Sequence, residues 1–199
     1  GKVTQIGSYA FQDCTSLASV TIPDSVTSIG SYAFEYCHSL TSITIPDSVT
    51  EIGHYAFKVC SNLAEFSGKF ASVDKRCLIV DGVLNSFAPA GLTEYTIPDS
   101  VTTIGSYAFG ECSSLKSVTI SDSVTTIGGY AFIECIGLEI VDIHDSVIKI
   151  GESAFKNCTS LASVIIPNGI SSINSYTFQE CSSLKTIIIP NSVTNIGHQ

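Results

Sequence analysis

Eight cysteines, four histidines and 18 acidic residues are the side chains of this 199-residue chain that could do chemistry. Thiols and imidazoles bind zinc or act as nucleophile and base, and rows of carboxylates bind calcium. Each of these uses requires unlike side chains to meet at suitable distances. The spacing of each residue type along the chain therefore decides which uses are open.

The cysteines recur at one spacing rather than in clusters. Only Cys77 lies out of register, and the others each precede a leucine by three residues: Cys14, Cys37, Cys60, Cys112, Cys135, Cys158 and Cys181. Zinc sites require ligand pairs two to four residues apart, and the chain has none. Cysteine is also a common small apolar core residue. We expect buried free thiols, with disulfides between neighbouring repeats as the alternative.

A column of acidic residues recurs in the same way. Its members are Asp24, Asp47, Asp99, Asp122 and Asp145, followed by Asn168 and Asn191. Calcium takes six to eight oxygen ligands, whereas each repeat offers one carboxylate and a serine. Asp and Asn side chains both bond a backbone N–H two residues on, so turn closure accounts for the column. We predict no metal site and no cofactor, with calcium binding as the alternative.

The histidines do not converge on one another or on a nucleophile. His54 and His198 occupy a repeat position that other units fill mostly with serine, His38 follows Cys37, and His144 stands where most repeats have proline. The glycines follow the repeat and form no phosphate-binding loop. We therefore predict that the chain is not an enzyme and has no catalytic residues.

The charge balance limits the partners. The formal net charge is −9, with only nine Lys and Arg, which excludes nucleic acid as a ligand because phosphate binding requires a basic patch. No apolar run reaches the 18 residues of a membrane span, so we predict no membrane insertion in this segment. A protein partner stays open, and the sequence leaves the oligomeric state undetermined.

A repeat positions all of these residues. Leucines mark the start of successive units, at Leu17, Leu40, Leu63, Leu92, Leu115, Leu138, Leu161 and Leu184. The interval is 23 residues except for one unit of 29. A fixed period of this size is typical of a solenoid, in which each unit buries its apolar face by stacking on its neighbours.

One unit, residues 40–62, shows the expected elements. Leu40-x-x-Ile43-x-Ile45 alternates as a half-buried strand, and Pro46 ends it because proline cannot donate to a ladder. Residues 49–52 form a second extended piece. Ala, Phe and Cys at i, i+1 and i+4 within residues 54–60 then predict one or two helical turns on the opposite side.

The 29-residue unit at 63–91 departs from this pattern. Asp81-Gly82 lies between two apolar stretches, which predicts a β-hairpin in place of the helical turns. We expect a single solenoid over residues 1–199 that includes this irregular repeat. The chain begins and ends within a unit and lacks an initiating Met, so we also expect it to be a fragment of a longer protein.

The repeat resembles a known family. Leu-x-x-Ile-x-Ile matches the strand of leucine-rich repeats. The fuller pattern, Ile-Pro-Asp-Ser-Val, then Ile-Gly-x-Tyr-Ala-Phe, then Cys, resembles BspA-like leucine-rich repeats over essentially the whole chain. The predicted fold is an α/β solenoid: a leucine-rich-repeat right-handed superhelix with a parallel sheet on the concave face and short helical turns on the other. The resemblance implies a secreted or surface-anchored adhesion protein that binds extracellular-matrix proteins.

The sheet face is the predicted binding surface. Its outward positions carry hydroxyl and acidic side chains in early units and isoleucines in later ones. The candidate partner-binding residues are Ser42, Thr44, Glu94, Thr96, Ser117, Thr119, Ile140, Asp142, Ile165 and Ile188. Ile165 and Ile188 should lie side by side, because their strands are neighbours.

The predicted function is an extracellular or cell-surface scaffold that binds a protein, with host matrix proteins as the expected class. The alternative is a rigid spacer within a larger surface protein, without a ligand of its own. Uniform Ser and Thr side chains in the first units suit the spacer, because a selective site needs varied side chains.

Overall fold

The computed structural model describes residues 2–198, and its regular elements in that range are 17 short β-strands. The chain divides into two compact units. Unit 1 contains the residues up to Val80 together with Asn85–Ala90, and unit 2 contains Asp81–Leu84 and the residues from Gly91 onward. Within residues 2–198, no helix could cross a membrane.

Unit 1 contains two parallel sheets. One is formed by β1 (Gln5–Ile6), β2 (Ser28–Ile29) and β4 (Glu51–Ile52), and the other by β3 (Ser42–Ile45) and β5 (Glu65–Gly68). β6 (Cys77–Val80) of unit 1 is followed by Asp81 and Gly82 of unit 2 and then by β7 (Val83–Phe87), whose first two residues belong to unit 2. Both turn residues have positive φ, 50° and 77°, as the type I′ turn of a two-residue hairpin requires.

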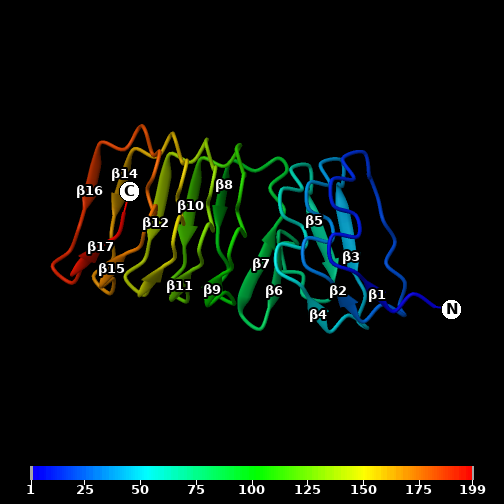
Figure 1. The fold of residues 1–199 in the computed structure, drawn as a ribbon. Helices are drawn as coiled ribbons and strands as arrows, with labels where there is room; N and C mark the ends of the chain where they lie inside the picture. Colours follow the sequence, from blue (N-terminus) through cyan, green and yellow to red (C-terminus); the bar gives the residue numbers. More distant parts are fainter. Residues whose placement is uncertain (1, 199) are drawn as a thin grey trace. The chain divides into compact units, whose positions relative to one another are not determined.

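Unit 2 contains two rows of strands (Figure 1). The first row is β8 (Glu94–Thr96), β10 (Ser117–Ile120), β12 (Ile140–Ile143), β14 (Ser163–Ile165) and β16 (Thr186–Ile188). The second row is β9 (Thr103–Ile104), β11 (Thr126–Ile127), β13 (Lys149–Ile150), β15 (Ser172–Ile173) and β17 (Asn195–Ile196). Each row is parallel, as the solenoid prediction requires.

The register pairs residues that are one repeat apart. Ser117 lies opposite Ile140 in the first row, and Ile127 lies opposite Ile150 in the second. One repeat therefore makes one coil, and equivalent residues stack in columns. This confirms the predicted solenoid with parallel sheets. We name each coil after its first-row strand, so that the β12 coil is residues 138–160 and the β14 coil is residues 161–183.

The core of each unit is a stack of identical side chains. In unit 2 the rings of Phe109, Phe132, Phe155 and Phe178 form a ladder with centroid distances of 4.8, 5.1 and 5.6 Å. Phe11, Phe34 and Phe57 form the same ladder in unit 1. Leucine, isoleucine and valine columns surround the rings and are almost fully buried. Each coil therefore buries its apolar side chains only through its neighbours.

The predicted helical turns are wrong, because the segment that follows each second-row strand contains no helix within residues 2–198. Tyr130 and Glu134 have φ of 59° and 57°, which a right-handed helix excludes. The N–H of Phe132 donates to Ala154 in the next coil at 2.8 Å, whereas that of Cys135 closes a turn on Phe132 at 3.3 Å. Backbone donors thus alternate between the next coil and the local turn.

The cysteine column lies in this turn segment. Seven of the thiols are buried and Cys14 is half-buried, and all are free, as expected. Cys135 Sγ donates to the Phe109 carbonyl at 2.9 Å, and Cys158 Sγ to that of Phe132 at 3.1 Å. Each of these thiols therefore packs as a small apolar group and also ties its coil to the preceding one.

The predicted role of the aspartate column is wrong. The turn closes through the backbone, for example from Val49 N–H to the Pro46 carbonyl at 3.1 Å, and within residues 2–198 the Asp47 carboxylate accepts no hydrogen bond. The serine that follows instead forms a hydrogen bond to the preceding coil, since Ser48 Oγ donates to the Val26 carbonyl at 2.7 Å. Ser25, Ser123, Ser146 and Ser192 donate to the preceding coil in the same way.

Candidate binding face and groove

The structure places the predicted binding residues on strands, with their side chains directed outward. Ser117 is half-buried, and the others are exposed: Ser42 and Thr44 on β3, Glu94 and Thr96 on β8, Thr119 on β10, Ile140 and Asp142 on β12, Ile165 on β14 and Ile188 on β16. Ser42 and Thr44 belong to unit 1, and the others to unit 2. We call the outward side of β8, β10, β12, β14 and β16 the sheet face.

Three isoleucines distinguish the later strands of the sheet face. Ile140, Ile165 and Ile188 have 60%, 64% and 54% of their surface exposed. Ile165 lies directly opposite Ile188 in the ladder, so the expectation that these two lie side by side is confirmed. Ile140 is paired with Ser117 instead. The earlier strands carry hydroxyl or acidic side chains at the equivalent positions.

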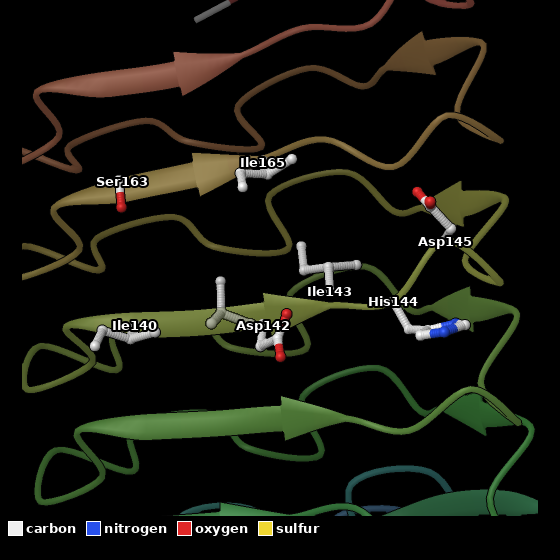
Figure 2. Close-up of a pocket in the computed structure, with 8 residues that line it drawn as sticks. Ile140, Asp142, Ile143, His144, Asp145, Ser163 and Ile165 are labelled. Atoms are coloured by element: carbon white, nitrogen blue, oxygen red, sulfur yellow. The ribbon is translucent and has the colours of Figure 1, made fainter.

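A groove of about 530 Å³ opens beside these isoleucines, between β12 and β14 (Figure 2). Its lining comes from Ile140, Val141, Asp142, Ile143, His144 and Asp145 on and after β12, and from Ser163 and Ile165 on β14. The structure therefore brings together three of the predicted residues, Ile140, Asp142 and Ile165. Ile143, which would be a core residue in a regular coil, is only half-buried here, whereas Ile120 and Ile166 are both 2% exposed.

The groove coincides with a break in both strand rows. β12 ends the sheet that contains β10 and β8, and β14 begins a separate sheet with β16. In the second row, β13 and β15 likewise belong to different sheets. We call the contact between the β12 and β14 coils the open joint, and the contact between the β10 and β12 coils the closed joint.

One substitution in a glycine column explains the break. At the closed joint, a Cβ on Gly151 would lie 2.3 Å from the backbone nitrogen of Gly129, a distance that no side chain tolerates. The N–H of Gly151 can therefore approach and donate to the Ile127 carbonyl at 2.8 Å. The β14 coil has Asn174 at this position, and its side-chain amide donates to the Ile150 carbonyl at 2.5 Å. Within residues 2–198, the Asn174 backbone N–H makes no such bond.

A second substitution removes another tie. Ser146 Oγ donates to the Val124 carbonyl at 2.8 Å across the closed joint. The β14 coil has Gly169 at the serine position, so Val147 receives no hydroxyl bond across the open joint. A Cβ at Gly169 would meet Ile148 Cγ2 at 3.0 Å. The loss of both ties lets the strand side of the β14 coil move away from the β12 coil.

The polar groups of the groove are acidic or neutral. Asp145 accepts the N–H of Asn168 at 3.3 Å, which places one carboxylate at the mouth of the joint. His144 Nδ1 accepts the N–H of Ser146 at 3.1 Å. The lining contains no lysine or arginine. The groove therefore combines aliphatic walls with uncompensated negative charge.

The side chains that could do other chemistry remain apart. Within the described part of the chain, no three or more His, Cys, Asp or Glu residues are grouped to hold a metal ion. Burial raises the pKa of Cys60 to about 12 and that of Cys37 to about 11, and the charge of the neighbouring column thiol adds to each rise. These thiols stay protonated near neutral pH and are poor nucleophiles.

The predicted list of binding residues omits five groove residues, namely Val141, Ile143, His144, Asp145 and Ser163. Ile143 occupies a core position, and Asp145 belongs to a column assigned to turns. A signal was present: His144, Gly169 and Asn174 depart from the repeat in close succession. Three departures near one joint indicate a local change in stacking.

Comparisons with known proteins agree with this geometry. The family model described as "BspA type Leucine rich repeat region" matches six copies, over residues 1–78 and 84–199. A leucine-rich cell surface protein from Faecalibacterium prausnitzii A2-165 is 31% identical with a TM-score of 0.80, over 94% of this chain and 57% of that one. No curated protein sequence matches the chain.

Two further solved structures share the fold. The Treponema pallidum leucine-rich repeat protein is 27% identical with a TM-score of 0.56, over 97% of this chain and 77% of that one. The pneumococcal vaccine antigen PcpA is 23% identical with a TM-score of 0.73, over 98% of this chain and 54% of that one, a likeness of fold alone. The chain thus spans little more than half the length of the Faecalibacterium and pneumococcal proteins.

Proposed function

The chain belongs to the BspA-type leucine-rich repeat family, and from this membership we propose that it is a protein-binding segment of a cell-surface or secreted protein. The similar Faecalibacterium protein is described as a cell surface protein, which supports this location. Solenoids present long regular surfaces that suit protein partners. The proposed partner is a protein, and host extracellular-matrix proteins are the first class to test. The proposed role is non-enzymatic.

One observation carries the proposal. Ile140, Ile165 and Ile188 are each more than half exposed on the sheet face, at positions where the repeat elsewhere carries hydroxyl or acidic side chains. The paired positions of Ile165 and Ile188 make a continuous apolar strip. Exposed apolar patches bordered by polar side chains are typical of interaction sites. The strip supports binding through the sheet face of unit 2.

The test is binding of the chain to a panel of immobilised matrix proteins. The variant Ile165→Thr/Ile188→Thr restores the hydroxyl character of the earlier strands. We expect it to lose binding at least tenfold, because each side chain buries substantial apolar area in a complex. The matched control is Ile136→Thr/Ile148→Thr, which changes two isoleucines that are 50% and 62% exposed but lie outside the sheet face. Equal binding by both variants would remove the sheet face as the site.

A second candidate is the rigid spacer, which the face of unit 1 favours. The outward positions of β3 carry Ser42 and Thr44, and Ser67 on β5 continues the pattern opposite Thr44. Apart from Glu65, which lies opposite Ser42, these positions carry hydroxyls, and hydroxyls give a partner little to select. If the chain binds no protein on the panel while the full-length protein does, the spacer is the better account.

A further inference from the structure

We propose that the groove at the open joint binds an extended basic segment of a partner protein, with a lysine or arginine flanked by aliphatic side chains. This inference rests on the proposed function, since it assigns a ligand class to one part of the sheet face. It depends on three observations: the aliphatic walls of the groove, its unopposed carboxylates, and the length of its lining.

The aliphatic walls match the stem of a long basic side chain. Ile140 and Ile165 are 60% and 64% exposed, and Ile143 is half-buried beside them. Lysine and arginine lay their methylene groups along apolar surface and keep the charged head near polar groups. A partner's own aliphatic residues would cover the remaining exposed area of the isoleucines.

The carboxylates supply the charge selection. Asp142 is exposed, and its carboxylate has no hydrogen-bonding or ion-pairing partner among residues 2–198, whereas Asp145 is held at the joint by Asn168. The lining includes no lysine or arginine to neutralise them. The net charge of −9 adds a long-range field that attracts cations. The same charge disfavours a second copy of this chain as the occupant.

The length of the lining indicates an extended segment rather than a small cation. The β12 side is formed by consecutive residues from Ile140 to Asp145, which at about 3.3 Å per residue span roughly 16 Å. An extended stretch of about five residues has the same length. A bare metal ion would need a group of ligands, and residues 2–198 contain no such group.

The probe is a fluorescein-labelled peptide, acetyl-Leu-Lys-Leu-Lys-Leu-amide, and the control peptide has glutamate in place of lysine. Fluorescence anisotropy at low salt should show binding of the lysine peptide only. Asp142→Asn/Asp145→Asn should weaken this binding about three- to tenfold, because each exposed charge pair contributes modestly. Added salt should reduce the difference by screening.

Two further variants separate the groove from general acidity. Asp99→Asn/Asp122→Asn changes the net charge equally, at two exposed positions of the aspartate column outside the groove, and should alter affinity less than twofold. Gly169→Ser/Asn174→Gly restores both ties of the closed joint and should abolish peptide binding. Its fold is checked by circular dichroism. Equal weakening by the two aspartate pairs, or unchanged binding after closure of the joint, would overturn the proposal.

The outcomes also separate this inference from the proposed function. If Ile165→Thr/Ile188→Thr no longer binds the matrix proteins but the wild-type chain does not bind the lysine peptide, the sheet face binds protein and the groove inference fails. If the chain instead self-associates through this face in sedimentation experiments, and Asp142→Asn/Asp145→Asn strengthens that association, the occupant is a second copy and the inference is overturned.

Discussion

The closed joint and the open joint join the same columns of residues and differ in whether their strands pair. At the closed joint, Ser117 pairs with Ile140 in the first row and Thr126 with Lys149 in the second. At the open joint neither row continues, and a groove of about 530 Å³ takes its place. The comparison teaches that the loss of strand pairing coincides with two changes in the repeat, glycine to Asn174 and serine to Gly169.

The turn side of the two joints is the same. The N–H of Phe132 donates to Ala154 at 2.8 Å across the closed joint, and that of Phe155 donates to Thr177 at 2.9 Å across the open joint. Cys181 Sγ still reaches the Phe155 carbonyl at 3.1 Å. The open joint therefore opens on its strand side alone. Leu161 in the core beneath it is fully buried.

The largest expected effect comes from copying the open joint into the closed one. Gly151→Asn places a Cβ 2.3 Å from the backbone nitrogen of Gly129, so one coil has to move. We expect a loss of about 2–3 kcal/mol in the free energy of unfolding, in the range of overpacked cores. Urea denaturation measures it.

Gly7→Asn is the matched control for this experiment. No atom lies within 4 Å of a Cβ built on Gly7, although it occupies the same repeat column. This variant should therefore change stability by less than about 0.5 kcal/mol. If Gly151→Asn is as harmless as the control, the glycine column does not set strand pairing, and the account of the open joint is wrong.

Much of this architecture is predictable from sequence, because it follows from columns. The leucine interval and the Ile-x-Ile alternation indicate parallel strands, and the cysteine column indicates buried thiols. The turn segment is different. Ala, Phe and Cys have helix-like spacing, but Tyr130 adopts φ of 59° so that alternate N–H groups reach the next coil. Nothing in local propensity favours tyrosine there, so the pattern predicts the wrong element.

The groove could be predicted only in part. Ile140, Asp142 and Ile165 stand out because their columns carry other residue types in earlier units. The contribution of Asn174 requires a distance, since a glycine column signals close packing only when the neighbouring backbone is known to lie within about 3 Å of the missing Cβ. Sequence therefore indicates that the joint is unusual, and the structure shows on which side it opens.

The second prediction tests whether the turn side of the open joint excludes water, as the turn side of the closed joint does. Burial raises the pKa of Cys158, and the neighbouring thiols Cys135 and Cys181 add to the rise. Burial also raises the pKa of Cys181 to about 11. Unfolded thiols ionise near pH 8.5, so these groups stabilise the folded state below that pH. The stability is lost as pH rises from about 8.5 toward 11.

Urea midpoints measured from pH 7 to 11 should fall over this window. Cys181→Ala should make the free energy of unfolding less dependent on pH, by an amount that corresponds to about one proton. Cys14→Ala, which removes a half-buried thiol of the same column, should leave the slope closer to that of the wild type. If Cys181→Ala leaves the slope unchanged, water already reaches the turn side at the open joint, and the two joints differ on both sides.

The third prediction closes the open joint. In Gly169→Ser/Asn174→Gly, a serine hydroxyl can donate to the Val147 carbonyl, and the backbone N–H of residue 174 can approach Ile150. We expect a gain of at most about 1 kcal/mol, since two new hydrogen bonds are offset by the lost Asn174 side-chain bond to Ile150, by the greater chain entropy of glycine and by the crowding of Ile148. Hydrogen exchange should slow at Val164 and Ile173. Unchanged exchange there would mean that other residues hold the coils apart.

The smallest effect is expected from removing one tie of the closed joint. Ser146→Ala deletes the bond from Oγ to the Val124 carbonyl and should cost about 0.5–1 kcal/mol. The matched control is Ser100→Ala, because the exposed Ser100 hydroxyl of the same column makes no hydrogen bond within residues 2–198. A larger loss accompanied by faster hydrogen exchange in β13 would mean that the serine column alone holds the strand rows together. Gly169 would then be a sufficient cause of the open joint, and Asn174 would fill the gap rather than create it.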